Sequence, residues 1–218
     1  FDEGMQFERQ RFDVLVNGTE SKALRHLFLA ERAAAKIADL PADTPVAPVR
    51  SVAVIGAGTM GGGIAMSFAN AGIPVTLVEA RQEALDRGLA TIRKNYDGTV
   101  AKGKLAREEA DARIARIVPT LDFGQVAGAD LVIEAVFEDM DVKKELFRKL
   151  DALCKANAIL ATNTSRLGVN EIATTTTRPG SVIGLHFFSP ANVMRLLEVV
   201  RGQATAPGVI ASSMAMAR

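Results

Sequence analysis

The periodicity of apolar and polar residues changes near residue 50 of the chain. Beyond that point, short apolar runs alternate with longer amphipathic segments. Continuous apolar runs are typical of strands buried in a parallel sheet, and helices of this length supply the right-handed crossovers between them. The predicted strands are 52–55, 75–78, 131–135, 159–161 and 182–185, and the predicted helices are 60–71, 82–102, 107–117 and 142–153.

This order of elements predicts the α/β class, with a Rossmann-type, doubly wound and mainly parallel sheet. A further apolar run opens at Glu198 and is placed to return beside the strand at 182–185. Residues 208–218 are long enough for one more short helix.

The first part of the chain has a helical pattern of its own. Residues 1–16 place apolar side chains at a ragged helical spacing, which Asn17 and Gly18 interrupt. Ser21 is then the expected N-cap of a second helix, because its hydroxyl can accept a hydrogen bond from a free backbone N–H. The apolar face of that helix consists of Leu24, Leu27, Phe28, Ala34, Ala35 and Ile37.

Three prolines within eight residues, Pro41, Pro45 and Pro48, predict a linker after these helices. We therefore expect a helical connector at 1–49 and an α/β domain at 50–218. The chain begins with Phe1 rather than Met, and we expect it to be a piece of a longer polypeptide.

Composition excludes several classes of protein. The 218 residues include 26 Lys and Arg against 25 Asp and Glu, and 48% are hydrophobic. This balance excludes a disordered chain and a basic surface that neutralises nucleic-acid phosphates. No apolar stretch reaches the roughly 18 residues that a membrane span requires. The single cysteine, Cys154, cannot form an internal disulfide, which favours a reducing, cytoplasmic location.

A glycine-rich loop directly follows the first predicted strand. Gly56, Gly58 and Gly61 form a G-x-G-x-x-G at the start of the next helix. In such loops the first glycine permits a tight turn, the second lets a pyrophosphate approach the backbone, and the third lets helix and strand pack closely. The N–H groups and partial positive charge at the helix N-terminus also favour a pyrophosphate.

An acidic residue follows this loop at the spacing typical of dinucleotide-binding folds. Glu79 ends the second predicted strand, 79 − 56 = 23 residues after the first glycine. Its carboxylate would accept hydrogen bonds from an adenosine ribose and repel a 2′-phosphate, which favours NAD over NADP, although Arg81 could accommodate that phosphate. The alternative is a glycine-rich turn of some other α/β protein, with Glu79 on its surface.

His186 and Glu198 are candidates for proton transfer. If the run at Glu198 returns beside the strand of His186, the carboxylate can hold one imidazole nitrogen and leave the other for a substrate. An imidazole, with its ordinary pKa of about 6.5, suits this task at neutral pH. The alternative is a structural histidine near a surface glutamate.

Two further polar groups follow predicted strands, where open α/β sheets bind ligands. One contains Asn163 and Ser165, and ordinary turn and cap chemistry is the alternative for it. The other contains Glu134 and Glu138, with Lys143 near the start of the next helix. A cation there opposes the helix dipole, so we expect a local anion or a cofactor hydroxyl to compensate it, or else solvated charges.

In this order, the motifs resemble the NAD-binding domain of the L-3-hydroxyacyl-CoA dehydrogenases. The matching segments are the glycine-rich loop with Glu79, Glu134-Ala-Val-Phe-Glu138, Asn163-Thr-Ser165, and His186-Phe-Phe-Ser-Pro190 with Glu198. The resemblance extends over about residues 50–202, and the spacings 186 − 165 = 21 and 198 − 186 = 12 fit the family. Residues 1–49 resemble the connector between the enoyl-CoA hydratase and dehydrogenase modules of multifunctional β-oxidation enzymes.

The resemblance implies NAD-dependent oxidation of an L-3-hydroxyacyl-CoA to a 3-oxoacyl-CoA. It makes His186 the general base, Glu198 its electrostatic support, and Ser165 a hydrogen-bond partner of substrate and nicotinamide. The cofactor contacts that it implies are Gly56, Gly58, Met60, Gly61, Glu79, Val136, Phe137, Glu138, Lys143, Ser165 and Ser189. Ser189 departs from the single-function members, which commonly have Asn there, and its shorter side chain weakens that contact. No metal is implied.

The resemblance also implies partners in the same polypeptide. In this family the acyl pocket belongs to a helical domain that follows the NAD-binding domain. We expect that domain to be absent from this chain, and a hydratase-like module to precede the chain. The chain alone is then expected to bind NADH with little activity. Neither a nucleic acid nor a membrane span is expected. Two alternatives remain open: a non-catalytic NAD-binding module, and a dehydrogenase of another hydroxy acid.

Overall fold

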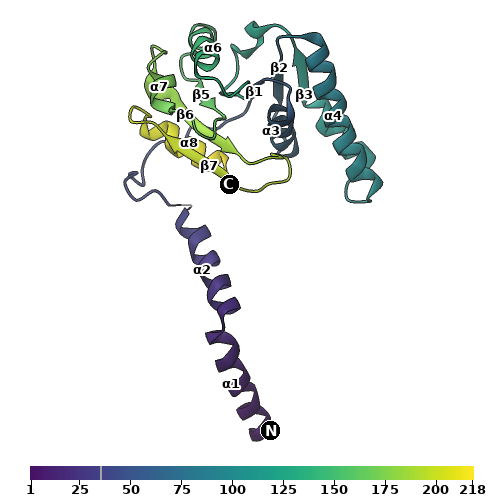
Figure 1. The fold of residues 1–218 in the computed structure, drawn as a ribbon, viewed down its shortest axis with the longest axis vertical. Coiled ribbons are helices and arrows are strands. Elements are labelled where there is room, and N and C mark those ends of the chain that lie inside the picture. The colour runs from purple at the N-terminus through teal and green to yellow at the C-terminus, as the bar shows by residue number, and fades with distance from the viewer. Residues whose placement is uncertain (35) are drawn as a thin grey trace. The chain divides into compact units, whose positions relative to one another are not determined.

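The computed structural model describes residues 1–34 and 36–218, which form two units, Phe1–Ala42 and Asp43–Arg218 (Figure 1). Ala35, part of the expected apolar face, lies outside the described residues. The second unit starts before the predicted boundary at residue 50. The backbone N–H of Ala47 donates to the hydroxyl of Ser212 at 2.9 Å, which attaches this segment to the second unit.

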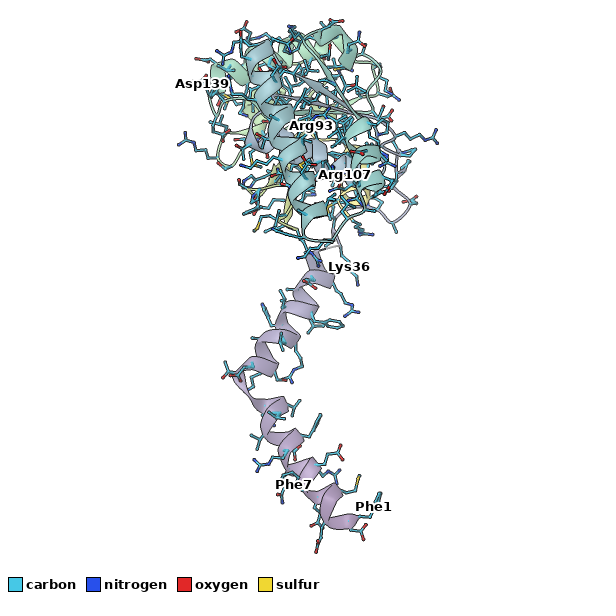
Figure 2. The ribbon with its side chains drawn as sticks, turned by 90° about the vertical axis from the view of Figure 1, so that its right-hand side faces the viewer. Phe1, Phe7, Lys36, Arg93, Arg107 and Asp139 are labelled. Carbon is cyan, nitrogen blue, oxygen red and sulfur yellow. The ribbon has the colours of Figure 1, made fainter. Side chains whose placement is uncertain are left out.

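Two helices, α1 (Asp2–Asn17) and α2 (Thr19–Ala34), make up most of the first unit. No described residue of either helix is buried, so Leu24, Leu27, Phe28 and Ala34 of the expected apolar face are exposed. Ile37, the last residue of that expected face, lies beyond the end of α2 and is half-buried. Phe1 and Phe7 extend away from the backbone of this unit (Figure 2). The N-cap predicted at Ser21 is wrong, because α2 begins at Thr19 and Ser21 lies in its first turn.

A seven-stranded sheet forms the centre of the second unit, in the order β3-β2-β1-β4-β5-β6-β7 (Figure 1). The neighbouring strands run parallel, except that β7 pairs antiparallel with β6. The strands are β1 (Val52–Ile55), β2 (Val75–Val78), β3 (Ile117–Thr120), β4 (Leu131–Glu134), β5 (Ile159–Thr162), β6 (Val182–Phe187) and β7 (Leu197–Arg201). The predicted doubly wound α/β sheet is confirmed, and the strand order reverses at β1.

Helices cover both faces of this sheet. Successive residues of a strand point to opposite faces, so Ala53 and Val54 of β1 mark the two sides. Ala53 packs with Phe147 and Leu150 of α6, whereas Val54 faces Gly61 of α3. The helices of this unit are α3 (Thr59–Asn70), α4 (Gln82–Ala101), α5 (Arg107–Ala115), α6 (Met140–Leu153), α7 (Val169–Ala173) and α8 (Pro207–Met216), with short 3-10 helices η1 (Phe123–Val126) and η2 (Pro179–Ser181). None of the described helices is long and apolar enough to cross a membrane.

The edge strand β3 is absent from the predicted strands. The helix predicted at 107–117 is too long, because α5 ends at Ala115 and Ile117 begins β3. Only Ile117 and Val118 precede Pro119 in this strand, so the sequence has too short an apolar run to mark the strand, and only Ile117 is buried. Pro119 cannot donate a hydrogen bond to a neighbouring strand, which is tolerated at a sheet edge.

Candidate active site

The glycine-rich loop joins β1 to α3 and depends on two of its glycines. Gly56 has a φ of +103°, and a Cβ there would lie 2.7 Å from the carbonyl oxygen of Ala135. A Cβ on Gly61 would lie only 1.8 Å from the carbonyl oxygen of Gly56. No side chain tolerates contacts this close, so the loop requires glycine at both positions.

Gly58 leaves open space in front of the first turn of α3. A Cβ at this position would meet nothing within 4 Å. Within the described residues, no side chain caps α3, so its first N–H groups keep their capacity to donate. Free donors at a helix N-terminus beside an open loop fit the pyrophosphate of a dinucleotide.

Glu79 follows β2 and connects to the loop through its carboxylate. Its Oε2 accepts a hydrogen bond from the N–H of Ala57 at 3.0 Å, and its Oε1 accepts one from the N–H of Ala80 at 2.7 Å. A carboxylate offers about four acceptor positions, so two remain for ribose hydroxyls. The residue is half-buried, which keeps it accessible to a ligand.

A buried ion pair lies at the carboxyl end of β4. Glu134 and Lys143 are both fully excluded from solvent, and the lysine Nζ lies 2.6 Å from Oε1. The N–H of Val136 donates to the same oxygen at 2.8 Å, and the hydroxyl of Thr162 donates to Oε2 at 2.7 Å. The cation near the start of α6 is therefore compensated by an anion, and the alternative of solvated charges is excluded.

Glu138 extends this ion pair toward the surface. Its Oε2 lies 3.4 Å from the Nζ of Lys143, and its Oε1 accepts hydrogen bonds from the Thr164 hydroxyl at 2.5 Å and the Ser165 N–H at 3.1 Å. Burial disfavours the ionised carboxylate, but these hydrogen bonds and the ammonium of Lys143 outweigh it, so the pKa of Glu138 lies below its ordinary value. Glu138 is thus held as an anion beside Ser165.

His186 and Glu198 face each other across the antiparallel pair of β6 and β7. The strand register places the two residues opposite one another, and Nδ1 lies 2.7 Å from the carboxylate of Glu198. Because Glu198 holds Nδ1, Nε2 is the nitrogen that can meet a substrate. The imidazole is half-buried and also contacts the ring of Phe188, with 4.7 Å between ring centroids.

Asn163 connects the ends of three neighbouring strands. Its side-chain oxygen accepts a hydrogen bond from the N–H of Phe187 on β6 at 3.1 Å. Its own N–H donates to the carbonyl oxygen of Glu134 on β4 at 2.8 Å. The loop that contains Ser165 and the strand end that contains His186 are therefore fixed side by side.

The expected site residues lie together at the end of the sheet where the parallel strands have their carboxyl ends, which we call the carboxyl edge of the sheet. Phe137 and Ser189 are exposed, and their assignment rests on the resemblance alone. Thr162 received no predicted role, although a polar residue that closes an apolar strand is a usable signal, and Asn163 was predicted only as part of a polar group that binds a ligand. No group of His, Cys, Asp and Glu that could hold a metal ion occurs among residues 1–34 and 36–218.

The chain is similar to several proteins of one family. Residues 51–218 match the family model described as "3-hydroxyacyl-CoA dehydrogenase, NAD binding domain". The peroxisomal bifunctional enzyme of Cavia porcellus is 42% identical over 224 residues, which cover 100% of this chain and 30% of that enzyme. The 3-hydroxybutyryl-CoA dehydrogenase of Clostridioides difficile is 46% identical over 154 residues, which cover 71% of this chain and 55% of that enzyme.

A solved structure shows the same arrangement of elements. The (S)-3-hydroxybutyryl-CoA dehydrogenase of Ralstonia eutropha matches with a TM-score of 0.76 and 35% sequence identity. The match covers 78% of this chain and 60% of that enzyme. The chain therefore spans only part of the length of the relatives that it matches.

Proposed function

Because the chain belongs to the 3-hydroxyacyl-CoA dehydrogenase family and forms its NAD-binding domain, we propose that it serves the oxidation of an L-3-hydroxyacyl-CoA to the 3-oxoacyl-CoA of fatty-acid β-oxidation. One observation above all supports this proposal. The imidazole of His186 lies 2.7 Å from the carboxylate of Glu198. The pair lies at the carboxyl edge of the sheet, where the glycine-rich loop follows β1. A base, its supporting anion and a dinucleotide loop are the groups that this oxidation needs.

In this proposal His186 acts as the general base. Its Nε2 takes the proton of the 3-hydroxyl as the O–H bond breaks, and the C3–O bond becomes the carbonyl of the product. Glu198 holds Nδ1 and stabilises the imidazolium that forms. Ser165 donates a hydrogen bond to the substrate oxygen and orients it toward the imidazole. NAD, when bound, supplies the acceptor for the hydride that leaves C3.

The proposed cofactor contacts divide at β1, because a dinucleotide lies across the point where the strand order reverses. The adenosine half then lies toward β2, and the nicotinamide half lies toward β4. The contacts proposed for the first half are Gly56, Gly58, Met60, Gly61 and Glu79. Those proposed for the second half are Val136, Phe137, Glu138, Lys143, Ser165 and Ser189.

Titration with NADH and NADPH, followed by nicotinamide fluorescence, tests the choice of cofactor. We expect NADPH to bind at least about tenfold more weakly, because the Glu79 carboxylate repels the 2′-phosphate. Glu79→Gln should narrow this gap while NADH binding is retained. Equal affinities of the unchanged chain for the two cofactors would contradict the role of Glu79.

We further propose that the acyl-CoA lies between this unit and a following helical domain, and that a hydratase-like module precedes them in the same polypeptide. The Cavia porcellus enzyme, of which the chain covers 30%, supports further domains. Positioning by a second domain can contribute a rate factor of about a hundred or more. The test compares acetoacetyl-CoA-dependent NADH oxidation by residues 1–218 with that by the chain extended through a relative's C-terminal domain. Equal turnover would contradict this division of the site.

The proposed compartment is the cytoplasm. The single cysteine, Cys154, is buried and has no second cysteine with which to form an internal disulfide, which suits a reducing environment. The Cavia porcellus relative is named as peroxisomal, so the peroxisome is the alternative location. A fluorescent fusion of the whole polypeptide separates the two, because cytoplasmic protein gives diffuse fluorescence and peroxisomal protein gives discrete spots.

A further inference from the structure

We infer that Glu134, a carboxylate that lies beneath the surface, makes the nicotinamide site selective for the oxidised cofactor. The inference rests on the proposed function, in which the nicotinamide half lies over the end of β4. Three charged side chains meet there: Glu134, Lys143 and Glu138. Two carboxylates and one ammonium leave the group with a formal charge of −1, and we call these three residues the β4 charge group.

The second carboxylate is in excess of what pairing requires. Lys143 lies 3.4 Å from Glu138, whose single negative charge would be enough to balance the ammonium. Glu134 adds a further carboxylate 2.6 Å from the same Nζ, and its complete burial carries a cost of desolvation that its hydrogen bonds offset. A buried ion pair is often no more stabilising than apolar side chains of the same size, so stability does not explain this excess.

Other nearby cations do not cancel the excess charge. Lys144 on α6 is paired with Glu171 on α7. Arg166, next to Ser165, is exposed, and solvent screens its charge. Asp139 and Asp141, at the start of α6, are themselves acidic. The β4 charge group therefore keeps its formal charge of −1 at the carboxyl end of β4.

The two forms of the cofactor respond differently to this charge. The nicotinamide ring carries a positive charge in NAD⁺ and none in NADH, so only the oxidised form gains from the excess carboxylate. The β4 charge group borders the glycine-rich loop, since a Cβ on Gly56 would lie 2.7 Å from the carbonyl oxygen of Ala135. It lies on the side of β1 away from Glu79, which is the proposed nicotinamide side. Charge there acts through a medium that screens poorly.

Glu134→Gln removes the excess charge and keeps the shape of the site. The amide oxygen can accept from Val136 and Lys143, as Oε1 does now. The amide nitrogen can donate to the hydroxyl of Thr162, which is able to accept as well as donate. The measurement is the Kd of NAD⁺, NADH and ADP-ribose for the complete 218-residue chain. We expect the ratio of the NAD⁺ Kd to the NADH Kd to rise about tenfold, with ADP-ribose unchanged because it lacks the ring.

Two matched variants separate charge from structure. Asp130→Asn removes one carboxylate at the opposite end of β4, and we expect it to leave the ratio unchanged. The double variant Glu134→Gln, Lys143→Gln returns the β4 charge group to −1, and its ratio should return to within about threefold of the unchanged chain. If the single variant does not fold, the double variant still allows the inference to fail. In that case, a ratio of the NAD⁺ Kd to the NADH Kd that is about tenfold higher in the double variant than in the unchanged chain would overturn the inference.

Three further results would count against the inference or against the proposed function. An unchanged ratio in Glu134→Gln, or an equal weakening of both cofactor forms, would overturn the inference and leave Glu134 a structural role. A similar rise in Asp130→Asn would overturn it in favour of a general effect of net charge. An unchanged chain that binds neither NADH nor ADP-ribose would instead contradict the proposed function, so the two failures are distinguishable.

Discussion

The two ends of β4 each bear an acid–lysine pair, but their surroundings differ. At the carboxyl end, Glu134 and Lys143 are fully buried. At the amino end, Asp130 lies 2.5 Å from Lys155, and 25% and 34% of their side chains remain exposed. The other oxygen of Asp130 accepts hydrogen bonds from the N–H groups of Arg50 at 2.8 Å and Ser51 at 3.1 Å.

The difference shows how the same residue types take separate roles at two edges of one sheet. At the amino edge one acid balances one base, and the acid also attaches the start of β1 to the start of β4. At the carboxyl edge a second acid, Glu138, joins the pair, and the charges do not balance. We therefore expect changes at the carboxyl edge to alter binding and turnover, and changes at the amino edge to alter stability.

The largest effect is expected at the carboxyl edge, from His186→Ala in a protein that turns over acetoacetyl-CoA. Loss of the general base should lower turnover by roughly 10²–10⁴-fold, with NADH affinity nearly unchanged. The control is His26→Ala, the other histidine of the chain, on the exposed helix α2. If His186→Ala turned over at close to the rate of the unchanged protein, the assignment of the general base to His186 would be wrong.

Gly61→Ala should disrupt the glycine-rich loop at the same edge. The added Cβ would lie 1.8 Å from the carbonyl oxygen of Gly56, so the turn must move. We expect NADH affinity to fall by about tenfold or more and the free energy of unfolding to fall by about 1–3 kcal/mol. Gly98→Ala in α4 is the matched control, because a Cβ there meets nothing within 4 Å. It should leave binding unchanged and stabilise the helix by about 0.5–1 kcal/mol. Equal NADH affinities for the two variants would contradict the packing requirement at Gly61.

Asp130→Asn should act in the opposite way, on stability alone. We expect the free energy of unfolding at pH 7 to fall by about 1–2 kcal/mol, because charge-assisted hydrogen bonds are lost, while NADH affinity stays the same. Urea unfolding and fluorescence titration measure the two quantities. A loss of NADH affinity in this variant would abolish the distinction between the two edges.

The same variant predicts a pH dependence. Burial opposes ionisation of Asp130, but Lys155 and the N–H of Arg50 outweigh it, so its pKa lies below the ordinary value. A depressed pKa adds stability above the unfolded-state pKa of about 3.9, and that stability is lost as pH falls through the folded-state pKa. The difference in unfolding free energy between the unchanged chain and Asp130→Asn should therefore shrink below about pH 4. A constant difference from pH 7 to pH 3 would contradict this contribution of Asp130.

The smallest effect of cofactor binding is expected on the alkylation rate of Cys154, the thiol at the end of α6. Burial raises the pKa of Cys154 to about 11, so little thiolate exists at pH 8. Iodoacetamide should modify the native chain slowly and the urea-unfolded chain quickly, and bound NADH should not change the native rate. Rapid native alkylation would show that this end of the molecule opens more readily than its packing implies.

The predicted and observed folds agree best for the strands that are buried on both faces of the sheet. Strands β1, β4 and β5 are buried along their whole length, and a continuous apolar run predicts each of them. The edge strand β3 has one buried residue and a proline, so local pattern alone did not distinguish it from the end of a helix. Ser21 failed as an N-cap for a related reason, since a helix start depends on the preceding backbone, which already turns at Gly18.

The sequence alone determined the features that depend on local geometry. The spacing of Gly56, Gly58 and Gly61 specifies a turn, an open approach and a close helix contact, each within one strand–loop–helix unit. Burial of whole strands likewise needs only the apolar run itself. The class of the fold and the choice of a dinucleotide as ligand follow from such local signals.

Only the tertiary structure decided which charged groups meet. Lys143 near a helix start opposes the helix dipole, but the sequence left a local anion, a cofactor hydroxyl and solvated charges as alternatives. The structure brings both carboxylates to one ammonium, and it brings Glu198 to His186 across two antiparallel strands. Such partners are set by loop paths and strand register, because long side chains reach several positions and no local periodicity records which one they reach.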